Sequence, residues 1–299
     1  MNKGSILIAT LIIIAIAASL ALTINTFSIK KISNIRQLKD NYQAAIYANN
    51  VIKLIDDMLR NQQNIINPNN RIFNLPEIPI DNGIIKISIK PLNAKINLNL
   101  FKTGLNVTRK RVLCAVNSLL EQNNLPDNYI DTLLKWLGIK GSNYEVFSTD
   151  WSCKATYKRK LLDTLYEINY IPFCGHKLYD IFKNSFTVIS DNPKININFA
   201  NQQTLSLYLP EISQYVAKII EYRKKSPFVD VSMIRNICNI SDQTYLKILP
   251  FITTTSNIFY VKIFIILNNT SYCYHYVIKK DKNYIKILKY IEAGSNDYF

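Results

Sequence analysis

The sequence predicts an α+β fold, in which one long N-terminal helix packs on an antiparallel sheet that carries a large helical insertion. The chain starts with an uncharged apolar stretch that passes into an amphipathic helical pattern. Apolar and polar residues alternate at 84–90 and again after residue 258, as in half-buried strands. Between these two regions, over residues 105–252, apolar residues recur with helical spacing.

The apolar stretch from Gly4 to Ile29 contains no charged residue. About 20 apolar residues span the hydrocarbon core of a bilayer, so we expect a transmembrane helix at 5–29. Ala17-Ala18-Ser19 resembles the exit of a secretory signal peptide, which leaves a cleaved signal as the alternative. We favour a retained anchor, because the helical pattern continues well beyond Leu22.

A stem follows the anchor without a break. Apolar residues keep three-and-four spacing from Ile32 to Leu59, and neither Pro nor Gly interrupts residues 5–66. We therefore expect residues 30–66 to extend the anchor as one rod of roughly 80–90 Å. Such a helix suits a protein that is held in lipid at one end and packs on a folded head at the other.

The net charge of +15 is consistent with a surface for nucleic acid or anionic membrane. The basic residues are scattered, however, and the chain is rich in Ile, Asn, Lys and Tyr throughout. We favour biased composition as the explanation. The five Cys leave at least one thiol unpaired within a monomer, and both a Cys153–Cys174 disulfide and free buried thiols stay open.

The sequence predicts no enzyme. Cys174-Gly175-His176 offers a thiol next to an imidazole, but adjacent side chains in a loop rarely reach a productive geometry. His275 lies in a Tyr-rich strand and is interpreted as a sheet residue. The sequence contains no Walker loop, dinucleotide fingerprint, G-x-S-x-G or H-E-x-x-H motif.

Two nearly identical pentapeptides flank the helical block: KINLN at 95–99 and KININ at 194–198. We interpret them as the places where the chain leaves and re-enters one sheet, and not as a fold repeat, because the residues after the first copy differ from those after the second. The first part of the sheet is then expected at 67–104. A three-stranded meander at 253–299 completes it.

Residues 196–240 resemble a helix-hairpin-helix unit of the competence-receptor type. Such hairpins bind DNA through a glycine-containing turn whose amides meet a phosphate. Here the turn is Pro-Glu-Ile-Ser, and Glu211 would repel an anion. We therefore rank Arg223, Lys224 and Lys225 as weak nucleic-acid candidates and expect no nucleic-acid partner; a packing module is the alternative.

The N-terminus resembles that of type IV pilins and type II secretion pseudopilins, with a short leader (1–4) ending in Gly4. The resemblance implies that a prepilin peptidase cuts between Gly4 and Ser5 and methylates the new amine. The family usually has Glu five residues after the cut, where this chain has Ala9. One minor pseudopilin, general secretion pathway protein K, characteristically lacks that Glu.

The order of elements is similar to the general secretion pathway protein K family along essentially the full length. The match is carried by Gly4, 95–99, 194–198, Ala200, Leu205, Ala217, Ile220, Arg223, Pro227 and Phe228. The resemblance implies a pilin-like sheet with a helical insertion, at the tip of a pseudopilus, with other minor pseudopilins and the major pseudopilin as partners. It also implies a single-pass inner-membrane protein with its head in the periplasm. Lys30, Lys31, Arg36 and Lys39 follow the anchor, which by the positive-inside rule favours the opposite orientation.

Calcium is not expected, although the family's insertion usually binds it after a Trp. After Trp136 this chain has Gly138 and Lys140 in the expected acidic places, and only Glu145 and Asp150 remain as weak metal candidates. The leading hypothesis is thus a tip pseudopilin that assists protein export. A membrane-anchored DNA-binding protein for uptake and a minor pilin of a type IV pilus are the alternatives.

Overall fold

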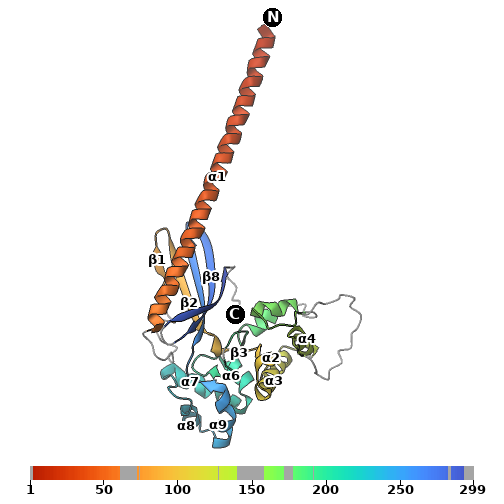
Figure 1. The fold of residues 1–299 in the computed structure, drawn as a ribbon, viewed down its shortest axis with the longest axis vertical. Helices are drawn as coiled ribbons and strands as arrows, with labels where there is room; N and C mark the ends of the chain where they lie inside the picture. Colours follow the sequence, from red (N-terminus) through yellow and green to blue (C-terminus); the bar gives the residue numbers. More distant parts are fainter. Residues whose placement is uncertain are drawn as a thin grey trace.

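The computed structural model describes residues 3–60, 73, 75–126, 128–139, 158–171, 178–190, 192–281 and 284–292. One helix, α1 (Lys3–Arg60), projects from a head made of a sheet and a group of short helices (Figure 1). The sheet lies along the C-terminal part of α1, and the short helices lie beyond the sheet, at the end away from the N-terminus (Figure 1). The predicted α+β architecture is confirmed.

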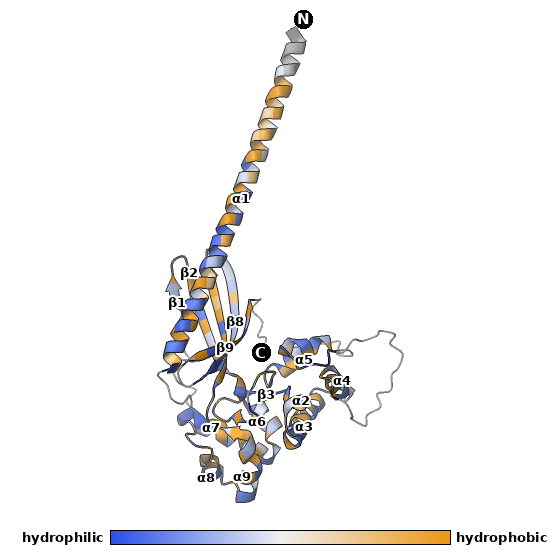
Figure 2. Cartoon of the chain, viewed as in Figure 1, coloured by the Kyte–Doolittle hydropathy of each residue, from blue (hydrophilic) through white to orange (hydrophobic). Residues whose placement is uncertain are grey.

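Helix α1 has 58 residues, which corresponds to about 87 Å at ~1.5 Å per residue. Residues 10–39 are exposed, and close packing begins at Ala44. From there the buried residues Ala48, Ile55 and Leu59 recur at helical spacing on one face. Figure 2 shows the corresponding change from a mostly apolar rod to a mixed one. The expected stem residues 61–66 lie outside the described part of the chain.

The main sheet has five strands in the order β1-β2-β7-β8-β9, and all neighbours are antiparallel. Asn268 and Asn269 adopt φ values of 50° and 64° and form the tight turn between β7 and β8. The predicted C-terminal meander is confirmed, whereas β1 was not expected. The strands are β1 (Ile78–Ile80), β2 (Gly83–Pro91), β7 (Ile258–Leu267), β8 (Thr270–Lys280) and β9 (Ile285–Glu292).

The buried face of α1 packs on one face of this sheet. Its Ala and Ile side chains join alternate residues of β2, β7 and β8 in a separate hydrophobic cluster. The tyrosines of β8, Tyr272, Tyr274 and Tyr276, belong to this cluster. The Tyr-rich strand therefore packs towards the stem.

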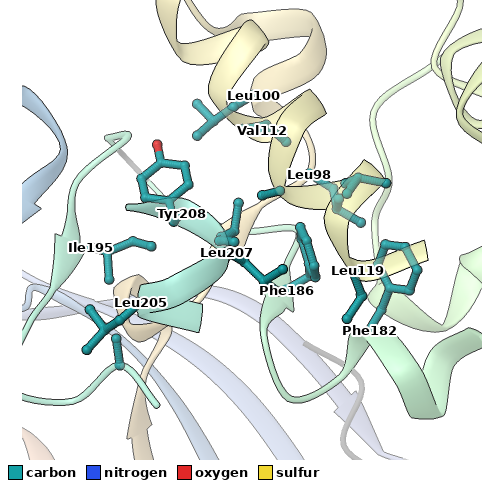
Figure 3. Packing of buried hydrophobic residues seen from close by; sticks show 14 of the residues in the cluster. Leu98, Leu100, Val112, Leu119, Phe182, Phe186, Ile195, Leu205, Leu207 and Tyr208 are labelled. Atoms are coloured by element: carbon teal, nitrogen blue, oxygen red, sulfur yellow. The ribbon is translucent and has the colours of Figure 1, made fainter. Parts of the chain in front are cut away.

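The helical region contributes a second and larger hydrophobic cluster. Figure 3 shows how Leu98, Val112 and Leu119 from its first half meet Leu207 and Tyr208 from its second half. Its helices are α2 (Leu100–Thr103), α3 (Asn106–Gln122), α4 (Asn128–Trp136), η3 (Leu165–Tyr170), α5 (Leu178–Phe182), α6 (Gln202–Tyr208), η4 (Pro210–Tyr215), α7 (Val216–Lys225), α8 (Met233–Cys238) and α9 (Asp242–Ile248), with the single 3-10 turns η2 (Leu92–Ala94) and η5 (Leu249–Phe251).

The helical region leaves and re-enters the main sheet at Pro91 and Phe259, which face each other in the β2–β7 register. The interpretation of KINLN and KININ as these two places was wrong. β3 (Ile96–Asn97) pairs in parallel with β4 (Phe186–Thr187), and β5 (Ile195–Asn196) pairs in parallel with β6 (Ile252–Thr253). Each ladder is a small sheet of its own, outside the five-stranded one.

The two pentapeptides nevertheless play the same structural role, and we refer to each ladder, together with the helices between its two strands, as a repeat. In each copy an Asn carboxamide oxygen (Asn97, Asn196) accepts from the backbone N–H two residues later, at 3.0 Å. The residue between them (Leu98, Ile197) donates to the partner strand at 2.9 and 3.0 Å. The helices between the strands of the two ladders differ in number and length, which agrees with the difference between the residues that follow the two copies.

Helical spacing of apolar residues also covers 159–168, but the structure has the 3-10 helix η3 here, which starts only at Leu165. The carboxylate of Glu167 explains the late start. Its Oε1 accepts from the backbone N–H groups of Asp163 and Thr164, at 2.7 and 3.1 Å, which closes a capping box. Lys158 binds both Asp163 and Glu167 and holds the preceding segment in place.

Candidate functional surfaces

The residues predicted for processing and assembly, Gly4, Ser5 and Ala9, lie in the first turns of α1. The helix from Thr10 onwards contains an 18-residue window apolar enough to cross a membrane, and none of that window is buried. The N-terminal half of α1 is therefore a candidate membrane anchor.

A stripe of exposed apolar side chains continues along α1 beyond this anchor. Tyr42, with 72% of its surface exposed, lies on it together with large aliphatic residues. At 100° per residue the stripe lies roughly opposite the face that packs on the sheet. It is thus available to other helices even where α1 is bound to its own head. The stripe consists of Ile32, Ile35, Leu38, Tyr42 and Ile46.

The turn of the helix-hairpin-helix unit, between α6 and α7, is built around Glu211. Asn201 caps α6 by accepting from the Thr204 backbone N–H at 2.7 Å, and Pro210 starts η4 after α6 ends. The carboxylate of Glu211 receives both guanidinium nitrogens of Arg111, which comes from α3 in the first half of the helical region. The two distances, Nη1–Oε2 and Nη2–Oε1, are 3.0 and 2.7 Å.

Arg111 does more than neutralise Glu211. Its Nη1 also donates to the Tyr208 carbonyl at 2.7 Å, and its guanidinium lies 4.1 Å from the centre of the Phe251 ring. Burial raises the pKa of Glu211, but the hydrogen bonds from Arg111, a backbone hydrogen bond and the charges of Arg111 and Lys247 together outweigh burial and keep that pKa below its usual value. The place where a DNA-binding hairpin meets a phosphate is thus occupied by a carboxylate that is bound within the chain. We refer to this pair as the Arg111–Glu211 clasp.

The three basic nucleic-acid candidates lie in two different environments. Arg223 is partly buried, and its Nη1 donates to the carbonyls of Ile197 and Ala200, both at 2.6 Å. Its pKa is lowered by burial. Lys224 and Lys225 are exposed at the end of α7. Arg223 therefore ties α7 to the second pentapeptide, and only the two lysines face solvent.

The weak metal candidates Glu145 and Asp150 lie outside the described residues. Within the described residues, no group of three or more His, Cys, Asp and Glu is placed to hold a metal ion. At the base of segment 140–157, the Lys102 ammonium donates to the carbonyls of Leu137 and Arg159, at 2.9 and 3.2 Å. The positive charge of Lys102 therefore holds together the two residues, Leu137 and Arg159, that flank this segment.

His275 lies in the middle of β8, between β7 and β9, and is fully buried. Its Nδ1 lies 2.6 Å from the hydroxyl of Tyr260, and the two rings stack. This is the packing expected of a sheet residue. His176, Cys153 and Cys174 lie outside the described residues, while Cys114 is an exposed free thiol and Cys238 a buried one.

Sequence reasoning missed Arg111, which stands 100 residues from Glu211. It also missed the roles of Asn99 and Asn198, each of which bonds to the backbone of a distant segment. Asn99 reaches Leu162, and Asn198 reaches Phe228. The only sequence signal for these roles is the repeated pentapeptide itself.

A comparison with solved structures finds a chain with a similar fold. The chain is similar to a chain in the crystal structure of the GspK-GspI-GspJ complex from the enterotoxigenic Escherichia coli Type 2 Secretion System. The match has a TM-score of 0.71 and covers 88% of this chain and 100% of that one, at 15% identity. The chain has a type II secretion pseudopilin fold.

Sequence comparisons add less. A family model for the helix-hairpin-helix motif matches residues 190–253 of this pseudopilin-like chain, which include the second ladder and the clasp's Glu211. No curated protein matches the chain. The solved complex therefore supports the fold as a whole, and the motif match supports its second helical repeat.

Proposed function

We propose that this chain is a minor pseudopilin of the general secretion pathway protein K type, which sits at the tip of a type II secretion pseudopilus. The observation that carries the proposal is the structural match, which covers 88% of the chain at a TM-score of 0.71. The proposed role is structural and assists protein export without catalysis. Its partners are other minor pseudopilins and the major pseudopilin.

The arrangement of the chain supports a terminal position. The exposed apolar stripe on α1 offers a surface for neighbouring stem helices. Ala9 lacks the carboxylate that in the related family meets the amine of a neighbouring subunit, so this subunit needs no partner above it. The helical region lies beyond the sheet at the end of the head (Figure 1), where its bulk would block further addition. The head is proposed to face the periplasm, with α1 in the inner membrane.

The mature N-terminus tests this proposal. In cells with a type II secretion system, we expect mass spectrometry of the purified protein to find a chain that begins at a methylated Ser5. Ala9→Glu should leave co-purification with the other minor pseudopilins and export nearly unchanged. Gly4→Val is the control, because it should block trimming by the prepilin peptidase and abolish export. A mature chain that begins at Met1 or beyond Leu22 would contradict the proposal.

The helix-hairpin-helix match at 190–253 keeps DNA binding as the second candidate function. The Glu211 carboxylate in the turn opposes it, and so does the engagement of Arg223 with backbone carbonyls. We expect no retention of the full-length protein on duplex DNA at about 0.1 M salt. Retention that falls steeply with rising salt, and that weakens in a Lys224→Gln, Lys225→Gln double variant, would instead establish DNA binding.

A further inference from the structure

Four basic residues surround α1 between the apolar stretch and the head: Lys30, Lys31, Arg36 and Lys39. All four side chains are exposed, and in the described part of the chain none of them forms a salt bridge. No acidic residue precedes Asp40, whose carboxylate accepts from the Asn268 side chain at 2.9 Å. The helix thus carries an uncompensated positive segment, which we call the basic collar.

The position of the collar matches a lipid headgroup layer. The hydrocarbon core takes about 20 helical residues, and the apolar stretch ends at Ile29, immediately before Lys30. The collar spans about 14 Å of helix, whereas the polar layer on each side of a bilayer is roughly 5–8 Å thick. Long Lys and Arg side chains reach back over such distances. In an α-helix every Cα–Cβ bond tilts towards the N-terminus, so Arg36 and Lys39 lean towards the bilayer.

The collar surrounds the helix and does not form one face of it. At 100° per residue, the four residues lie at roughly 0°, 100°, 240° and 180° around the axis. A single partner helix would meet only part of this ring, whereas lipid headgroups surround a transmembrane helix on all sides. The ring lies before the first residues of α1 that pack on the head, so the head does not cover it.

We propose that the basic collar binds the phosphates of anionic phospholipids in the leaflet on the side of the head. Lys and Arg are the side chains that bind phosphate, and each one near an anionic surface strengthens binding roughly fivefold. By the positive-inside rule alone, the collar residues would favour a cytoplasmic head. Lipid binding gives the same residues a function on the periplasmic side. The proposal depends on α1 being a membrane anchor and not on a pseudopilin role.

The test compares lipid retention by the full-length protein in neutral detergent. The protein is titrated with phosphatidylglycerol or phosphatidylcholine, and mass spectrometry measures the lipid retained. The collar variant combines Lys30→Gln, Lys31→Gln, Arg36→Gln and Lys39→Gln. The matched control removes four exposed charges from the head, through Lys110→Gln, Lys160→Gln, Lys218→Gln and Lys247→Gln.

We expect the wild type and the control to retain phosphatidylglycerol at least about tenfold better than phosphatidylcholine, and the collar variant to lose this preference. About 0.5 M salt should also weaken the preference. A collar variant that retains the anionic lipid like the wild type, or a wild type without preference, would overturn the proposal. If the collar variant instead lost only its co-purification with other pseudopilins, the charges would bind carboxylates on a neighbouring stem, and the lipid proposal would be wrong.

Discussion

Asn198→Ala is expected to destabilise the helical region by about 3–5 kcal/mol, because each buried backbone group that it leaves unpaired costs about 1–3 kcal/mol. Asn198 is 1% exposed. Its carboxamide nitrogen donates to the Phe228 carbonyl at 2.9 Å, and its oxygen accepts from the Phe228 N–H at 2.8 Å. Alanine at this position deprives the Phe228 carbonyl and the Phe228 N–H of their hydrogen-bond partners and leaves a cavity. Urea denaturation of the detergent-solubilised protein, followed by circular dichroism, measures the loss.

Asn99, the counterpart of Asn198 in the first repeat, allows the same experiment to be made independently. Asn99 holds the N–H and carbonyl of Leu162 at 2.8 and 2.9 Å, and donates to the Val188 carbonyl at 2.8 Å. Asn99→Ala should therefore show a loss of similar size. Asn236, exposed in α8, supplies the control, and Asn236→Ala should stay within about 0.5 kcal/mol of the wild type. A loss below about 1 kcal/mol at both Asn99 and Asn198 would show that the two clamps do not hold the repeats.

Removing either side of the Arg111–Glu211 clasp is expected to be the next largest change. Arg111→Met leaves Glu211 without its bidentate partner and the Tyr208 carbonyl without its donor. For a pair that is only partly buried we expect a loss of about 2–3 kcal/mol. The double variant Arg111→Met, Glu211→Met should lose less than Arg111→Met alone, because no charge is left unpaired. A double-mutant cycle by urea denaturation measures the coupling.

The clasp also gives the stability a defined pH dependence. The pKa of Glu211 is lowered in the folded chain, so its contribution is present above the unfolded value near 4.5 and is lost as the pH falls through the lower folded value. Glu211→Gln should remove this contribution to the acid sensitivity. Asp180→Asn, which breaks the exposed Lys183–Asp180 pair, should change stability by less than about 0.5 kcal/mol and is the control. If the free energy of unfolding fell equally with pH in Glu211→Gln and in the wild type below pH 4.5, the clasp would be excluded as the cause of the acid sensitivity.

The sequence was informative where structure follows local periodicity. Three-and-four spacing located α1 and the helical region as a whole, and alternation located β2 and the meander of β7, β8 and β9. The expected hairpin turn at Pro210 and Glu211 also stands in the structure, as η4. Helix α1 and strand β2 bury one face, so their patterns carry the signal themselves, whereas β8 is buried on both faces from Tyr272 to Ile278.

The features that were missed depend on partners distant in sequence. The ladders β3–β4 and β5–β6 are two residues long, too short for any periodic signal. The capping carboxylate of Glu167 overrode the helical spacing before Leu165. No sequence motif links Arg111 to Glu211. Only the packing of α3 beside the turn between α6 and α7 brings the two side chains together. Long-range side-chain bonds of this kind require a structure.

The register pair Pro91–Phe259 has an architectural consequence. Strands β2 and β7 are antiparallel neighbours, so they pair as in a β-hairpin, and the whole helical region takes the place of the hairpin loop. The entropy of closing a loop grows only slowly with its length. The strands therefore tolerate wide variation in the size and content of the segment that they connect. The five-stranded sheet therefore keeps its pairing whatever the size of the helical region, because that region enters and leaves it at one register pair.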